Sequence, residues 1–164
     1  MLRVLFICWG NICRSPTAEA IFRREVEAAG LTDQVEIDSA GTSREHLGSP
    51  PDRRAQTEAR RRGLELCDLR ARQVTAADWE RFDLLLVADG PVERSLLRAA
   101  PPGADLAKVT RITAFLDPDG RFADDHLAGE VPDPYYGGAE GFTHVFGLLE
   151  EASTGILRHH LVAD

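Results

Sequence analysis

The stretch RVLFICWGNICRSP, residues 3–16, decides the fold. Its first part, 3–8, is a nearly continuous apolar run, which is typical of a strand buried on both faces of a parallel sheet. The segment 16–30, PTAEAIFRREVEAAG, predicts a helix, with Pro16 in its first turn and Gly30 at its end. A buried strand that leads through a short loop into a helix indicates a parallel α/β fold.

The rest of the chain continues this alternation of strands and helices. We predict strands at 35–41, 82–89 and 108–116, and helices at 51–64, 91–100 and 140–161. Residues 117–140 are rich in Asp, Gly and Pro and predict a long loop. The predicted fold class is therefore α/β: a three-layer sandwich with a four-stranded parallel sheet and helices on both faces. We expect one domain over residues 1–164.

The bulk composition excludes several classes of function. The net charge of −8 argues against nucleic acid and against an anionic membrane surface as the main partner. Three cysteines, Cys8, Cys13 and Cys67, are too few for the disulfide framework of a small secreted protein. The first residues lack the long apolar run of a signal peptide or membrane span. We therefore expect a cytoplasmic protein with reduced thiols.

The loop after the first predicted strand carries the chemistry. Ligands of open parallel sheets bind beyond the carboxyl ends of the strands, where Cys8 lies. Gly10 and Asn11 can adopt positive φ, so backbone N–H groups turn inward and, with a helix N-terminus near Ser15, attract a dianion. The guanidinium of Arg14 adds a two-pronged donor. These groups also favour a Cys8 thiolate facing a bound phosphate. Buried cysteines that act as small hydrophobes are the alternative interpretation.

The loop CWGNICRSP, residues 8–16, resembles the signature of the low-molecular-weight protein tyrosine phosphatases. The resemblance continues along nearly the whole chain in DSAGTS (38–43), PPDRRA (50–55), RARQ (70–73), FDLLLVAD (82–89) and DPYYGG (133–138). It implies a phosphotyrosine-protein phosphatase that hydrolyses phosphate monoesters through a phosphocysteine intermediate. The expected partner is a phosphotyrosine-containing protein or peptide, with inorganic phosphate and other oxyanions as inhibitors. We expect a monomer, no metal and no organic cofactor.

The resemblance also implies roles for individual residues. Cys8 is the nucleophile, Arg14 clamps the phosphate, and Asp133 is the general acid and then the general base. We expect Asp133 to be buried beside the thiolate, where it would hold its proton. An Asp-Pro pair on its own is typical of a simple turn. The predicted substrate-binding residues are Trp9, Gly10, Asn11, Ile12, Cys13, Ser15, Tyr135 and Tyr136.

Two positions depart from the family pattern. Asn11, Ser15 and Ser39 match family residues whose hydrogen bonds hold the loop, but Leu69 stands where a histidine of this network is common. We therefore expect one hydrogen bond to be missing or replaced. Ser15 is also a candidate helix N-cap and a donor to the thiolate. Glu45 stands where an aromatic residue is common, so the cleft should favour basic over acidic phosphopeptides, unless Glu45 is a surface residue with no role.

The remaining cysteines suggest redox chemistry. The resemblance implies that Cys13 forms a disulfide with Cys8, which protects the nucleophile from overoxidation. A buried, inert thiol is the alternative for Cys13, and Cys67 is expected to be structural.

Three other functions were weighed. A protein-arginine phosphatase shares this fold and loop, but typically has threonine where Ile12 stands, and an apolar residue there favours a phenyl ring. A thioredoxin-coupled arsenate reductase needs a further cysteine pair, and only Cys67 remains. A phosphate-binding module without catalysis would be expected to lack Cys8, Arg14 or Asp133, all of which are present.

Overall fold

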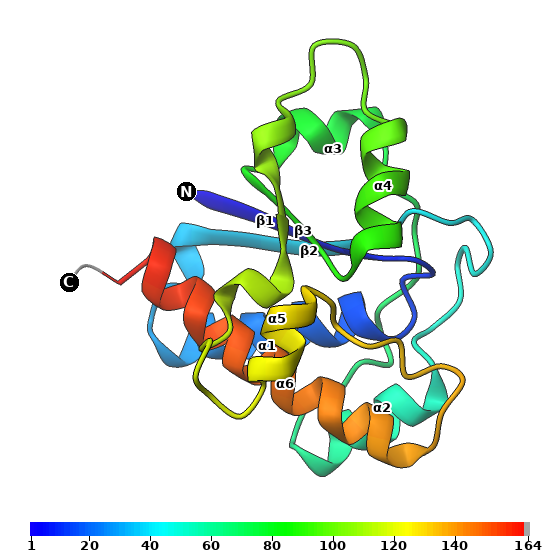
Figure 1. Ribbon diagram of the computed structural model, residues 1–164, viewed down its shortest axis with the longest axis vertical. Helices are drawn as coiled ribbons and strands as arrows, with labels where there is room; N and C mark the ends of the chain where they lie inside the picture. Colours follow the sequence, from blue (N-terminus) through cyan, green and yellow to red (C-terminus); the bar gives the residue numbers. More distant parts are fainter. Residues whose placement is uncertain (163–164) are drawn as a thin grey trace.

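The computed structural model describes residues 1–162 and contains a central sheet of four parallel strands (Figure 1). The strands are β1 (Leu2–Cys8), β2 (Val35–Gly41), β3 (Leu84–Val87) and β4 (Val109–Arg111), and their order in the sheet is β2-β1-β3-β4. β1 pairs with β2 over its whole length and with β3 from Val4 to Ile7. The predicted α/β class with four parallel strands is confirmed.

The apolar run of β1 is explained by two separate hydrophobic cores. Val4 and Phe6 belong to the core on one face of the sheet, and Leu5 and Ile7 belong to the core on the other face. Successive side chains of a strand point to opposite faces, so a strand between two layers of helices needs apolar residues at every position.

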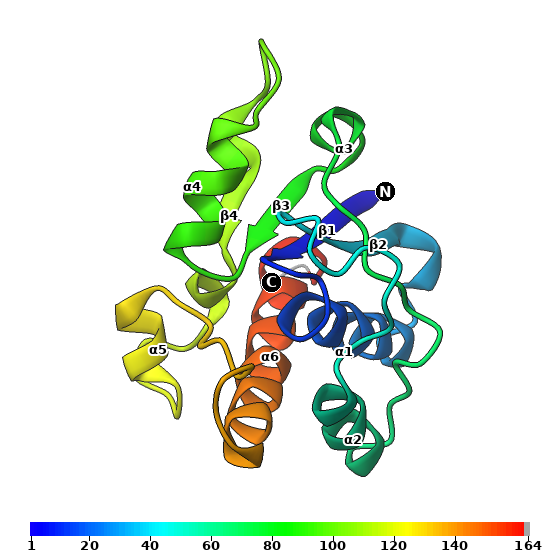
Figure 2. The same cartoon turned by 90° about the vertical axis from the view of Figure 1, so that its right-hand side faces the viewer.

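Helices cover both faces of the sheet (Figure 2). On the first face, α1 (Arg14–Ala28) packs against α6 (Ala139–His160), and α2 (Arg53–Arg61) packs against α6. On the second face, α3 (Ala76–Arg81) and α4 (Gly90–Arg98) supply Trp79, Val92 and Leu96 to the second core. The predicted three-layer arrangement is confirmed.

Two predictions about single elements are wrong, and one helix was not predicted. The predicted strand 108–116 ends at Arg111 and continues as a 3₁₀ turn, Ile112–Phe115, because Ile112 is buried in the first core without extended pairing. The predicted loop 117–140 contains a short helix, α5 (Ala123–Ala128). Helix α3 was not predicted, although Thr75 and Asp78 form a capping box at its start. Two further 3₁₀ turns span Thr32–Gln34 and Leu106–Lys108.

Loops from several elements meet at the carboxyl end of β1. The N–H groups of Thr42 and Ser43, just after β2, donate to the carbonyl oxygens of Cys8 (3.0 Å) and Trp9 (2.9 Å). Residues 8–14, here called the phosphate loop, therefore continue the sheet pairing beyond the strand itself. On the other side, the N–H of Val131 donates to the carbonyl oxygen of Ala88 at 2.7 Å. Within residues 1–162 no helix has the length and apolar character needed to cross a membrane.

Candidate active site

A cavity of about 120 Å³ lies where these loops meet. It is lined by Cys8, Trp9, Gly10, Ile12, Cys13, Arg14, Glu45, His46, Asp133, Tyr135 and Tyr136. The structure therefore brings nine of the eleven predicted site residues to one cavity. The other two, Asn11 within the phosphate loop and Ser15 just after it, are buried and do not line the cavity. Glu45 and His46 complete the lining.

The phosphate loop turns through Asn11, the only non-glycine residue with a positive φ (57°) among residues 1–162. This left-handed conformation directs the Asn11 N–H to the sulfur of Cys8, at 3.3 Å. Gly10 does not adopt positive φ, so that part of the prediction is wrong. Glycine is required there for space, because a Cβ atom would lie 2.8 Å from Cδ2 of His46.

Buried side chains hold this loop from behind. The hydroxyl of Ser15 lies 2.9 Å from the Cys8 sulfur, so it can donate to a thiolate. Nδ2 of Asn11 donates to Oγ of Ser15 at 2.7 Å and to Oγ of Ser39 at 3.0 Å. Ser15 is not a helix N-cap, because α1 begins one residue earlier and Cys13 occupies the cap position. Its hydroxyl is therefore available to the sulfur.

Leu69 contributes no side-chain hydrogen bond, and two further hydrogen bonds complete the network. The backbone N–H of Arg72 donates to Oδ1 of Asn11 at 3.0 Å, and the hydroxyl of Ser39 donates to Oε1 of Glu19 at 2.7 Å. Glu19 was not predicted as a site residue, because in the sequence it occupies an ordinary polar position of an amphipathic helix.

Arg14 is 3% exposed and is fixed by two acceptors. Its Nη1 donates to Oδ2 of Asp89 at 2.7 Å and to the carbonyl oxygen of Val131 at 2.9 Å. Although burial opposes the positive charge, nearby Cys8 and Asp89 raise the pKa of Arg14. Asp89 was also missed; its position at the end of a central strand, capping α4 through the Val92 N–H, was the available signal.

Asp133 lines the same cavity as Cys8. Its Oδ2 lies 3.8 Å from Nη2 of Arg14, and its Oδ1 accepts a hydrogen bond from the Tyr135 N–H at 3.1 Å. The side chain is 43% exposed, so the expected burial of Asp133 is wrong. The position beside Arg14 is nevertheless suitable for proton transfer to a group bound in the cavity.

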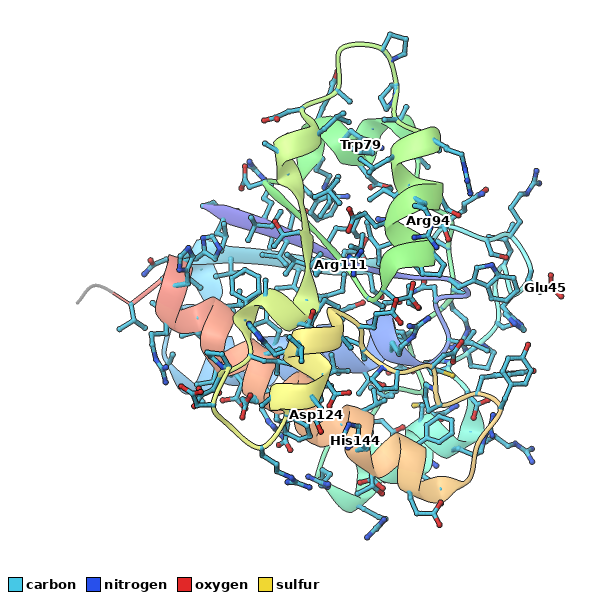
Figure 3. The ribbon with its side chains drawn as sticks, viewed as in Figure 1. Glu45, Trp79, Arg94, Arg111, Asp124 and His144 are labelled. Atoms are coloured by element: carbon cyan, nitrogen blue, oxygen red, sulfur yellow. The ribbon has the colours of Figure 1, made fainter. Side chains whose placement is uncertain are left out.

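Aromatic rings form the wall of the cavity. The His46 ring lies 6.1 Å from the Trp9 ring and 6.4 Å from the Tyr135 ring, and Tyr135 contacts Tyr136 at 4.9 Å. His46 therefore supplies the ring that was expected to be missing when Glu45 replaced an aromatic residue. Glu45 lies at the outer edge of the loop that follows β2 (Figure 3). The wall suits an aromatic group, with a carboxylate at its rim.

The second cysteine of the loop is a buried thiol. Burial and the nearby charge of Asp52 raise the pKa of Cys13. Cys8 and Cys13 are both free in this structure, and the disulfide between them stays a prediction.

Comparison with known proteins agrees with this geometry. The family model described as low molecular weight phosphotyrosine protein phosphatase matches residues 3–164. A low molecular weight protein-tyrosine-phosphatase of Streptomyces coelicolor is 44% identical over 158 residues, which cover 94% of this chain and 91% of that protein.

Two solved structures share the whole fold. The crystal structure of a protein tyrosine phosphatase from Entamoeba histolytica has a TM-score of 0.86 at 34% identity and covers 96% of both chains. That of a Drosophila arginine phosphatase has a TM-score of 0.87 at 28% identity and covers 99% of this chain and 100% of the other. Family match and close relative agree: the chain belongs to the low molecular weight phosphotyrosine protein phosphatase family.

Proposed function

We propose that this protein is a phosphotyrosine-protein phosphatase that works through a phosphocysteine intermediate. The observation that carries the proposal is the single cavity in which Cys8, Arg14 and Asp133 meet from two distant loops. A nucleophile, a phosphate clamp and a proton donor are the three groups that this two-step hydrolysis needs.

In the first step the Cys8 thiolate attacks the phosphorus atom of the bound phosphotyrosine. A P–S bond forms while the P–O bond to the tyrosine oxygen breaks. The N–H groups of the phosphate loop and the guanidinium of Arg14 bind the equatorial oxygens, where negative charge gathers. Asp133 gives its proton to the departing oxygen, so tyrosine leaves as a neutral phenol.

In the second step a water molecule attacks the phosphocysteine. The Asp133 carboxylate takes a proton from this water as the new P–O bond forms and the P–S bond breaks. Cys8 leaves as a thiolate, which the hydroxyl of Ser15 and the N–H of Asn11 stabilise. Inorganic phosphate is released and the enzyme returns to its starting protonation.

The cavity wall supports an aromatic substrate. Ile12 and the rings of Trp9, His46 and Tyr135 offer apolar contact to a phenyl ring, whereas a guanidinium would find its partner in the carboxylate of Glu45. Phosphoarginine is the competing substrate, because the Drosophila arginine phosphatase shares the fold. Turnover of matched phosphotyrosine and phosphoarginine peptides decides between them, and faster phosphoarginine turnover would reject the proposed substrate.

The core proposal is tested with para-nitrophenyl phosphate. We expect hydrolysis by the intact protein, its loss in Cys8→Ser, and a trapped phosphorylated protein in rapid-quench samples of the intact enzyme. Phosphate release that persists in a folded Cys8→Ser protein, or a phosphate bound to any residue other than Cys8, would reject the covalent mechanism.

A further inference from the structure

One buried glutamate lies behind the phosphate loop and has no part in the mechanism above. Glu19 is 5% exposed and lies one helical turn after Ser15 on α1. Its Oε1 accepts from the hydroxyl of Ser39 at 2.7 Å, and its Oε2 accepts from Nη2 of Arg23 at 3.0 Å. Taking a carboxylate out of water is costly, so its retention at this position calls for a reason.

The ionised carboxylate sets the direction of a chain of hydrogen bonds. A carboxylate only accepts, so the Ser39 hydroxyl must point its proton at Glu19. The lone pairs of Ser39 then accept from Nδ2 of Asn11, and this bond acts together with the Arg72 N–H on Oδ1 to fix the orientation of that amide. The second Nδ2 hydrogen points to Oγ of Ser15 at 2.7 Å. The Ser15 proton then has two acceptors, the Cys8 sulfur at 2.9 Å and the more distant carbonyl oxygen of Ala40 at 3.5 Å, and a Cys8 thiolate is the closer and the charged one.

We propose that Glu19 is a positioning residue that stabilises the Cys8 thiolate by orienting Ser39, Asn11 and Ser15 as successive donors. The inference rests on the proposed function of Cys8 as the nucleophile. Leu69 strengthens the case, because it lines the same surface hollow as Glu19 and has no polar group to orient Ser39 in place of Glu19.

The charges around Glu19 act in opposite directions. Burial raises the pKa of Glu19 and the charge of Asp38 on β2 adds to this, while Ser39 and Arg23 lower it. Arg72 binds Asp38 and so moderates its effect. The surface hollow next to Glu19 is also lined by charged residues, namely Arg24, Glu27, Glu65 and Asp68.

Two physical effects of Glu19 on the thiolate predict opposite results. If Glu19 acts mainly as a nearby negative charge, its removal favours the thiolate. If it acts mainly by orienting donors, its removal weakens the Ser15 hydrogen bond and disfavours the thiolate. The direction in which the substitution shifts the pH dependence of Cys8 reactivity therefore distinguishes the two effects, whatever the size of the shift.

The experiment measures the pH dependence of Cys8 alkylation by iodoacetate together with that of kcat/KM. We expect Glu19→Met to move the acidic limb of both profiles upward by about one pH unit, which corresponds to about tenfold slower alkylation below the limb. Glu19→Gln keeps an oxygen acceptor for Ser39 and should move the limb less. A downward shift in both variants, or no shift, overturns the proposal.

A matched control and a double-mutant cycle complete the design. Glu58→Met removes another buried glutamate, 4% exposed, which is bonded to Arg61 and Arg62 away from the phosphate loop; its profile should not move. In a Ser39→Ala background the chain of hydrogen bonds is already interrupted, so Glu19→Gln should add no further shift to the pH profile. An additive shift overturns the proposal even if Glu19→Met fails to fold. Alkylation requires no phosphatase turnover, so failure here is distinguishable from failure of the proposed function.

Discussion

The two loops that form the cavity are held in opposite ways. The phosphate loop is fixed from inside, by buried Asn11 and Ser15 and by backbone pairing with residues 42 and 43. The segment that carries Asp133, residues 129–138 and here called the acid loop, is mostly exposed and is held mainly by arginine side chains of other elements, with one backbone hydrogen bond from Val131 to Ala88. The difference matches the tasks of the two loops: a thiolate needs fixed donors, whereas one carboxyl must serve first a leaving oxygen and then a water molecule.

Three arginines hold the acid loop along its length. Arg14 donates to the carbonyl oxygen of Val131 at 2.9 Å, Arg111 to that of Gly129 at 2.7 Å, and Arg54 to that of Gly137 at 3.4 Å. Arg54 also stacks on the Tyr135 ring, 5.4 Å from its centre. The Arg14 contact is buried, but the Arg54 contact is exposed and individually worth little, so the far end of the acid loop should be easier to perturb than the phosphate loop.

The largest expected effect separates the tasks of the two loops. Asp133→Asn removes the proton donor but leaves the phosphate loop intact. We expect turnover of phenyl phosphate, whose leaving group needs protonation, to fall by about 10² to 10⁴-fold. Turnover of an aryl phosphate with a strongly acidic phenol should fall much less in the first step. Equal losses for both leaving groups would remove Asp133 from the role of acid.

The next effect tests the clamp that belongs to both loops. Arg14→Lys keeps a positive charge but cannot bind Asp89, Val131 and a phosphate at once. We expect kcat/KM to fall by about 10² to 10³-fold for every leaving group, with weaker inhibition by inorganic phosphate. Arg54→Lys, on the outside of the acid loop, is the control and should change both values only slightly. A loss confined to substrates with poor leaving groups would instead indicate that Arg14 acts by positioning Asp133.

A smaller effect tests the outside support of the acid loop. Arg111, at the end of β4, pairs with Glu93 of α4 and donates to Gly129, where α5 ends with a left-handed φ of 72° (Figure 3). We expect Arg111→Met to slow turnover of poor leaving groups by about three- to tenfold, the worth of one hydrogen bond, and to spare good ones.

Another arginine of α4 provides the control for Arg111. Arg94 itself lies close to Arg111 and to Glu130 of the acid loop, so the control is Arg98, whose exposed side chain in the last turn of α4 donates to the hydroxyl of Ser95 at 3.4 Å. Arg98→Met should leave turnover of both kinds of substrate unaffected. The same loss in Arg98→Met and Arg111→Met would mean that the two substitutions act through surface charge and not through support of Gly129.

The same contrast explains what the sequence could and could not predict. The phosphate loop was predictable because its residues are consecutive and follow a buried strand, so Cys8, Asn11 and Arg14 needed only local reasoning. Glu19, Asp89 and His46 were missed because their partners are distant in sequence and each residue is ordinary in its own segment. The exposure of Asp133 was likewise invisible, since proline on both sides says nothing about the packing of a loop.

The errors in the fold have a related cause. An apolar run indicates that residues are buried, but not that they form a strand. In the segment 108–116 Ile112 is buried in the first core, although the strand ends at Arg111. The short helix α5 has an acidic first turn and ends at Gly129, but six residues give too weak a periodicity to stand out in a loop rich in Asp and Gly.

The smallest expected effect on activity concerns the inner support of the phosphate loop. Asp78 is buried and binds the guanidinium of Arg72, whose backbone N–H donates to Asn11. Burial tends to raise the pKa of Asp78, but the hydrogen bonds from Arg72 and Thr75 outweigh it and hold this pKa below its ordinary value of 3.8. A carboxyl with a lowered folded pKa stabilises the protein above its unfolded pKa, and this contribution is lost as the pH falls through 3.8 toward the folded value.

We therefore expect Asp78→Asn to lower the free energy of unfolding at pH 7 by about 1 to 3 kcal/mol. The difference from the parent protein should shrink as the pH falls below about 4, because the parent then loses the same ionised group. Denaturant unfolding across this pH range measures it. Activity at pH 7 should stay nearly unchanged, since Asn11 is held by the backbone of Arg72 and not by its side chain. A gap in stability that is constant with pH would show that packing of Asp78, and not its charge, supports the phosphate loop from within.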